Sequence, residues 1–130
     1  MGAVYLLLLA FSNPRGLSPF NLKENKMIQE DFDAIVANRF ATCKKVLGSK
    51  TGQYASKKDR LHNFKLGALL IRQTPAQYAM ELATKHIVAV SDKLVNNEVM
   101  TDAFVTEKIG DIINYMLLIE AINQEKLEKK

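Results

Sequence analysis

The residues best suited to bind phosphate lie in a basic segment near the middle of the chain. Lys50 to Lys65 reads KTGQYASKKDRLHNFK and carries a net charge of +4. A basic loop before a helix can bind an anion, because cationic side chains and free backbone N–H groups converge there. Tyr54 adds a ring that could stack on a base. The alternative interpretation of the same charge is a solvated loop.

Two carboxylates four residues apart are the candidate metal ligands. Glu107 and Asp111 are expected to share one face of the last helix, where like charges repel each other. Mg²⁺ would turn this repulsion into attraction, since it prefers one or two carboxylates together with water and phosphate. Asn114, three residues further along, lies on nearly the same stripe and could bond a ligand. The alternative is a plain solvent-exposed face with Lys108 nearby.

Lys85 and His86 are adjacent in the middle of another expected helix. Lys85 suits a phosphate ligand, and His86 suits a residue that accepts and returns a proton. The alternatives are an i,i+4 ion pair between Glu81 and Lys85 and a histidine at the boundary of the core.

The order of these segments resembles that in a set of small phage and prophage proteins. The motifs are KTGQYA, DRLHNFK, KH and EKIGDIINYMLL, and the resemblance runs from Phe32 to Ala121. They are similar to the nucleotide modification associated domain family, a relative of the MazG-like all-α nucleoside triphosphate pyrophosphatases. Glu107-Lys-Ile-Gly-Asp111 is similar to the E-x-x-x-D helix that binds Mg²⁺ in MazG-like enzymes.

The resemblance implies a nucleotide-handling helical protein, homo-oligomeric and acting in the cytoplasm of a bacterial host. An active form would hydrolyse a (d)NTP to the monophosphate and pyrophosphate, with Mg²⁺ activating water. The resemblance implies Glu107 and Asp111 for the metal, Lys50, Arg60 and Lys65 for the phosphates, and Tyr54 or Asn63 for the base or sugar. Residue type and spacing add His86 as the catalytic candidate and Lys85 and Asn114 as candidates for nucleotide binding.

The chain departs from the MazG-like pattern in the helix that precedes E-x-x-x-D. Those enzymes carry a second acidic motif there, E-x-x-E, whereas this chain has Glu81 followed by Lys85 and His86. Two carboxylates alone supply few protein ligands for Mg²⁺. A non-catalytic module that sequesters a nucleotide or binds a host protein is therefore the alternative function.

The elements expected to position these residues are helices. The apolar spacing predicts an all-α, compact bundle of four to five helices, with no strand pattern. Thr74-Pro75-Ala76-Gln77 is the clearest helix start, since it combines a capping box with proline at the first helical position. The expected helices are Gln29 to Leu47 with Gly48 as the stop, Lys57 to Gln73, Thr74 to about Val95, and Thr101 or Thr106 to about Lys126.

The apolar stripes predict which side chains form the core. Cys43 lies on the stripe of the first helix and is expected to be a buried, unreactive thiol. Gly67 either weakens its helix or permits close packing. The broad apolar face of the last helix suggests self-association. The third helix is expected to face inward with Tyr78, Leu82, Ile87 or Val88, and Leu94.

Composition fits one globular domain and excludes several classes. The 130 residues are 48% apolar and 25% charged, and a single cysteine rules out a disulfide scaffold. We expect residues 27–130 to form one helical domain and residues 1–26 to be an extension, a weak signal peptide or an added strand. The nine-residue apolar run Ala3 to Phe11 is too short to span a membrane. Half of the net charge of +4 lies in residues 1–26, which favours a small phosphorylated ligand over a long nucleic acid.

Overall fold

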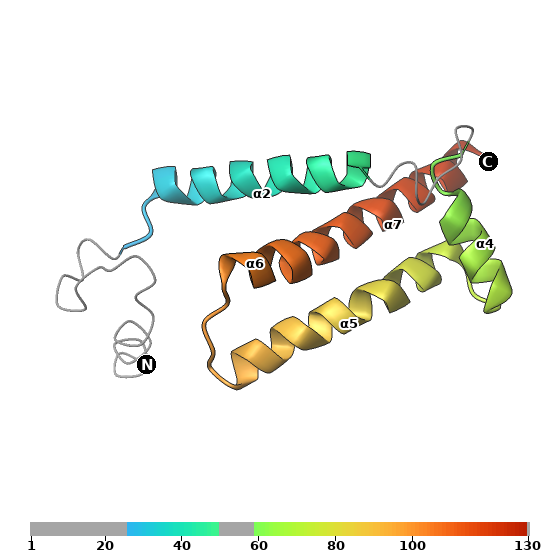
Figure 1. Cartoon of the computed structure of the whole chain (residues 1–130). Helices are drawn as coiled ribbons and strands as arrows, with labels where there is room; N and C mark the ends of the chain where they lie inside the picture. Colours follow the sequence, from blue (N-terminus) through green and yellow to red (C-terminus); the bar gives the residue numbers. More distant parts are fainter. Residues whose placement is uncertain (1–25, 50–58, 130) are drawn as a thin grey trace. The chain divides into compact units, whose positions relative to one another are not determined.

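The computed structural model describes residues 26–49 and 59–129, and in these ranges the chain is helical without a strand (Figure 1). This confirms the predicted all-α bundle. A short helix and a π-helix run directly into the last α-helix without a break. The elements are α2 (Gln29–Ser49), α4 (His62–Leu70), α5 (Pro75–Val95), α6 (Asp102–Phe104), the π-helix η1 (Val105–Ile109) and α7 (Gly110–Glu128).

The chain divides into two compact units, residues 1–37 and 38–130. The boundary falls inside α2, so only the part of this helix from Asn38 onward belongs to the second unit. In the first unit the described side chains of Phe32 and Ile35 are exposed, although they belong to the predicted apolar stripe. The leader proposed for residues 1–26 lies almost entirely outside the described residues, and the assignment of residues 27–130 to one domain stays a prediction.

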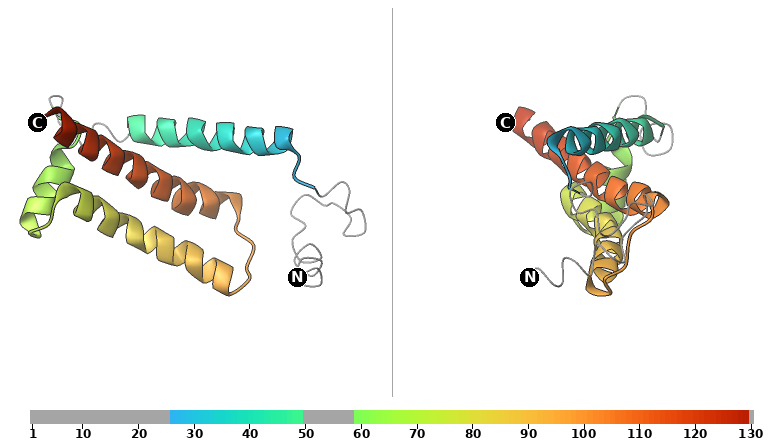
Figure 2. Two further views of the ribbon diagram at one scale, coloured as in Figure 1. Left: turned by 180° about the vertical axis from the view of Figure 1, so that it is seen from behind. Right: turned by 90° about the vertical axis from the view of Figure 1, so that its left-hand side faces the viewer.

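Within the second unit, α5 and α7 lie side by side and run in opposite directions (Figure 1 and Figure 2). Ala79 and Ala83 of α5 are completely buried, and such small side chains let the two helices approach closely. The core centres on these helices and α4, with Leu61, Phe64, Ala79 and Ile122 buried together and Leu82, Tyr115 and Leu118 packed against them.

The inward face of α5 was predicted only in part. Tyr78 and Leu82 pack against the core as expected, but Ile87, Val88 and Leu94 are exposed. The buried stripe follows Ala79, Ala83 and His86 instead. These three residues have helical spacing, and two of them were overlooked because alanine contributes little to an apolar periodicity.

The start of α5 confirms the prediction. The hydroxyl of Thr74 accepts a hydrogen bond from the backbone N–H of Gln77, and the Gln77 side chain accepts one from the backbone N–H of Thr74. Pro75 occupies the first helical position. The helix ends at Val95, as expected, and Asn97 follows with a positive φ of 55°.

Helix α4 is shorter than predicted because a left-handed residue ends it. Arg72 has φ 58°, its N–H donates to Leu69 O, and the N–H of Gln73 donates to Ala68 O. This pair of hydrogen bonds is a Schellman motif, which is most often built on glycine. An arginine at that position gives no sequence signal for a helix end.

The last helix begins at Thr101, whose hydroxyl accepts a hydrogen bond from the Phe104 N–H. The π-helix η1 was not predicted. A π turn holds one more residue than an α turn, so residues before it are rotated by roughly 100° relative to an uninterrupted α-helix. Glu107 lies within η1, and Asp111 lies in the first turn of α7.

Candidate functional site

A cavity of about 350 Å³ lies in the second unit, between the end of α2 and helices α4, α5 and α7. Its size is typical of small-molecule sites. Four residues that the sequence singled out line it, namely Arg60, Asn63, Asp111 and Asn114. Most of the remaining wall is apolar or aromatic: Val46, Leu47, Phe64, Leu66, Gly67, Leu70, Tyr78, Leu82, Tyr115 and Leu118.

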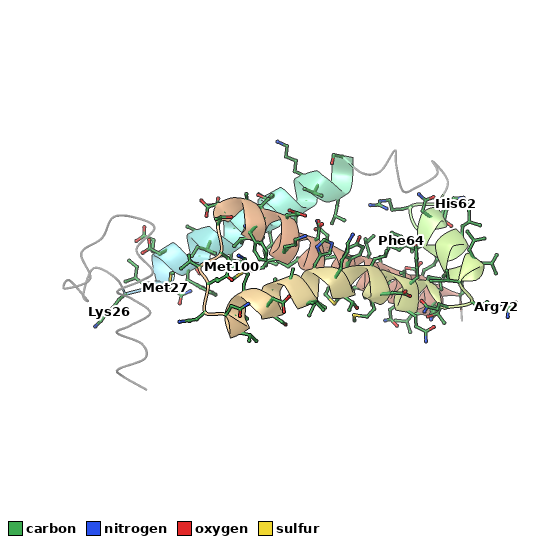
Figure 3. The ribbon with its side chains drawn as sticks, turned by 60° about the horizontal axis from the view of Figure 1, so that its bottom comes forward. Lys26, Met27, His62, Phe64, Arg72 and Met100 are labelled. Carbon is green, nitrogen blue, oxygen red and sulfur yellow. The ribbon has the colours of Figure 1, made fainter. Side chains whose placement is uncertain are left out.

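Helix α4 contributes Phe64 to an aromatic part of the cavity wall. Phe64 is buried and points from α4 toward α5 and α7, whereas Arg72 at the far end of α4 is exposed (Figure 3). The Phe64 ring meets Tyr78 edge to face, with ring centroids 6.2 Å apart. Edge-to-face pairs hold aromatic rings in defined positions, so this part of the wall is preorganised.

Asn114 is an unsatisfied polar group in the cavity wall. It is 6% exposed, and its Oδ1 is buried with no hydrogen-bond donor in the described part of the chain. Leaving a buried acceptor without a partner costs roughly 1–3 kcal/mol. A ligand donor that reaches this oxygen would recover that free energy.

Arg60 brings positive charge to the cavity. Its Nη2 donates to the backbone O of Leu47 at 3.4 Å, and its Nη1 is buried without an acceptor among the residues that the structure describes. Within the described ranges, no carboxylate lies at ion-pair distance from this guanidinium. The arginine is therefore suited to an anionic ligand group.

His86 lies behind the cavity wall, in contact with two residues that line it. It is 4% exposed, its Nε2 is 3.5 Å from Oδ2 of Asp111, and its ring stacks on Tyr115. Burial lowers the pKa of His86, with Lys108 and Lys85 adding to the decrease and Asp111 and Glu107 opposing it. The Nδ1 of His86 is buried, with no hydrogen-bond partner among the described residues. His86, the predicted catalytic residue, does not line the cavity.

The two predicted metal ligands have different surroundings. Asp111 lines the cavity, whereas the Glu107 side chain is 64% exposed and accepts a hydrogen bond from Lys108. That hydrogen bond lowers the pKa of Glu107. No group of three or more His, Cys, Asp or Glu side chains in the described ranges could hold a metal ion. These residues therefore do not fit a complete Mg²⁺ site.

Two further predicted phosphate ligands, Lys65 and Lys85, do not line the cavity. Lys65 forms ion pairs with Asp59 at 2.7 Å and Glu125 at 2.8 Å, and these hydrogen bonds raise its pKa. Lys85 is exposed on α5. Lys50 and Tyr54 lie outside the described residues, so their predicted roles stay predictions.

Arg39 is a partly buried cation that the sequence interpretation missed. Its Nη1 is buried, has no acceptor among the described residues and lies next to Gly110. Cys43, one turn further along α2, is fully buried, and its thiol contacts Gly110 O at 3.7 Å. Burial raises the pKa of this thiol, in agreement with the predicted unreactive cysteine. The i,i+4 spacing from Arg39 to Cys43 was the signal that could have identified Arg39.

Comparison with known proteins found no match to a family model, a curated protein or a solved structure.

None of the helices in the described ranges is long and apolar enough to cross a membrane.

Proposed function

We propose that this protein binds a nucleotide in the cavity between α4, α5 and α7. The observation that carries the proposal is the unsatisfied Oδ1 of Asn114 in the wall of a largely apolar cavity that also contains Arg60. An apolar pocket with a few convergent polar groups is the usual form of a small-molecule site.

The wall offers complementary groups for each part of a nucleotide. Phe64, Tyr78 and Tyr115 provide aromatic surface for a planar base. Arg60 provides a guanidinium for a phosphate oxygen, and the basic segment from Lys50 precedes it in the sequence. Apolar burial and charge-assisted hydrogen bonding would therefore both contribute to affinity.

Binding without hydrolysis is the form of the proposal that the residues support best. Magnesium-dependent release of pyrophosphate, which the resemblance to MazG-like enzymes implies, needs a carboxylate cage, and only Asp111 of the two candidates lines the cavity. A phage-derived protein that sequesters or senses a nucleotide needs only the binding site. An assay of pyrophosphate release in the presence of Mg²⁺ distinguishes binding alone from hydrolysis, because only an enzyme releases pyrophosphate.

Calorimetric titration of the full chain with a panel of NTPs and dNTPs tests nucleotide binding directly. Arg60→Met and Asn114→Leu should each weaken binding about tenfold, the effect of losing one hydrogen bond to a charged or buried group. Lys65→Met is the matched control for charge, because Lys65 is paired away from the cavity. A chain that binds none of these nucleotides would overturn the proposal.

We also propose that the protein self-associates through exposed apolar side chains at the end of α4. Leu69 and Leu70 are each at least 73% exposed, and Leu66 and Ile71 beside them in the sequence are 47% and 45% exposed. Large contiguous apolar patches on a protein surface commonly mark interaction sites. Light scattering after size-exclusion chromatography should give a mass above 14.6 kDa, and Leu69→Ser with Leu70→Ser should reduce it.

A further inference from the structure

We propose that the ligand presents two neighbouring hydrogen-bond donors to α7, where Asp111 and Asn114 accept them. This inference rests on the proposed nucleotide binding and specifies the chemistry of the bound edge.

The two acceptors are placed together by one helix. Asp111 and Asn114 are three residues apart on α7, which puts them on one face, and both line the cavity. The acceptors are the carboxylate oxygens of Asp111 and the unsatisfied amide Oδ1 of Asn114. This Oδ1 is buried in the present conformation, so the amide must rotate before a ligand can reach it. The hydrogen bond formed with the ligand would offset the free energy that this rotation costs.

The surroundings of Asp111 keep an oxygen available for the ligand. His86 approaches Oδ2 from behind the wall, at 3.5 Å, and no lysine or arginine in the described part of the chain pairs with this carboxylate. The side chain is 23% exposed, so it is accessible from the cavity. A ligand edge with an acceptor at this point would be repelled by the carboxylate, which adds selectivity against such ligands.

The polarity of the cavity fixes the orientation of the ligand. Acceptors lie on α7, and the guanidinium of Arg60 lies at the end of α2, where it donates to Leu47 O. A nucleotide then places its donor pair toward Asp111 and Asn114 and its phosphate toward Arg60. Within nucleotides, adjacent donors occur on the N1–H and 2-amino edge of guanine and on the 2′,3′-diol of ribose.

Calorimetric titration of the full chain with four ligands tests the donor pair and separates its two sources. The ligands are guanosine, inosine, adenosine and 2′,3′-dideoxyguanosine 5′-triphosphates. If the guanine edge binds, the inosine and adenosine nucleotides should be at least about tenfold weaker than the guanosine nucleotide. If the diol binds, the dideoxy nucleotide should be weaker by a similar factor. Either result supports the donor pair.

Asp111→Asn tests whether Asp111 causes the differences in affinity among the four ligands, since the amide keeps the shape of the carboxylate but loses its charge. It should reduce the preference among the four ligands to within about threefold, whereas Asp92→Asn, a change at an exposed aspartate of α5, should preserve it. If Asp111→Asn does not fold, the wild-type panel still decides. Equal affinity for all four ligands would overturn the donor pair while leaving nucleotide binding intact. No binding of any ligand would overturn both proposals.

Discussion

The ring of Tyr78 on α5 lies directly against the backbone of Gly67 on α4. A Cβ atom at Gly67 would be 2.4 Å from Cε1 of Tyr78 and 2.7 Å from Cζ. Contacts this short do not occur between real side chains, so α4 and α5 can meet in this way only because residue 67 is glycine. Both residues line the cavity, and the contact therefore shapes the candidate site.

Gly67→Ala should destabilise the protein by about 1–3 kcal/mol, the usual cost of overpacking. The clash with Tyr78 outweighs the gain of about 1 kcal/mol that alanine brings to a helix interior. The free energy of unfolding from urea denaturation gives the measurement. Gly48→Ala is the matched control, because a Cβ there has no neighbour within 4 Å, and it should be neutral or stabilising.

A second control assigns the effect of Gly67→Ala to the ring itself. In a Tyr78→Ala background, the added methyl group no longer meets an obstacle, so the same substitution should be neutral or favourable. An equal loss in both backgrounds would show that the contact with Tyr78 is not the cause.

The burial of His86 should make stability depend on pH. The pKa of His86 is lowered from its ordinary value of 6.5, so the unfolded chain binds a proton more readily than the folded one. The free energy of unfolding should therefore fall as pH decreases below about 6.5, by at most about 1.4 kcal/mol per pH unit from this group. Urea denaturation between about pH 5 and pH 8 measures this slope.

His86→Leu should flatten that slope, because the group that titrates in this range is gone. His62→Gln is the matched control, since His62 is exposed at the start of α4 and its replacement should leave the slope in place. The same slope in His86→Leu and in the unmodified protein would contradict the assignment. The hydrogen-bonded carboxylates of Asp59, Glu107 and Glu125 have lowered pKa values and act below this range.

Arg72→Gly should raise the free energy of unfolding by about 1 kcal/mol, because glycine adopts the left-handed conformation without a steric penalty. Asn97→Gly at the equivalent end of α5 should change stability by less, since asparagine tolerates φ 55° better than arginine tolerates 58°. A loss of stability in Arg72→Gly would mean that the arginine side chain stabilises this turn. Thermal and urea denaturation of both variants provide the comparison.

Removal of divalent cations should leave nucleotide affinity within about twofold of its value with Mg²⁺, because the described residues do not form a metal site. Glu107→Gln should have no effect in either condition, since this side chain is exposed and paired with Lys108. If chelation strongly reduces nucleotide affinity and Glu107→Gln reduces it as well, the magnesium hypothesis would be supported. Calorimetric titration of both proteins with and without a chelator measures these affinities.

Sequence patterns identified the helices well because their signals are local. The capping box at Thr74 and the turn at Asn97 were predictable from residue types alone. The Schellman turn at Arg72 and the π-helix η1 were not, since both depend on tertiary packing that overrides local preference.

The candidate site was predictable only as a set of residues. Arg60, Asn63, Asp111 and Asn114 line one cavity because the packing of helices that are distant in the sequence brings them together, and their roles stay predictions. Lys65 could not be excluded in advance, since its partner Glu125 is sixty residues away. The aromatic wall was missed because Phe64 and Tyr78 are indistinguishable from ordinary core residues in sequence.

The π-helix η1 has a consequence for the phase of the last helix. Because a π turn holds one residue more than an α turn, deleting one residue within Val105–Ile109 while restoring regular α-helix would turn the residues before it by roughly 100° relative to α7. Asp111 and Asn114 follow η1 and would keep their places in the cavity wall. A one-residue deletion there would therefore change which side chains at the start of this helix face inward without replacing any residue of the cavity.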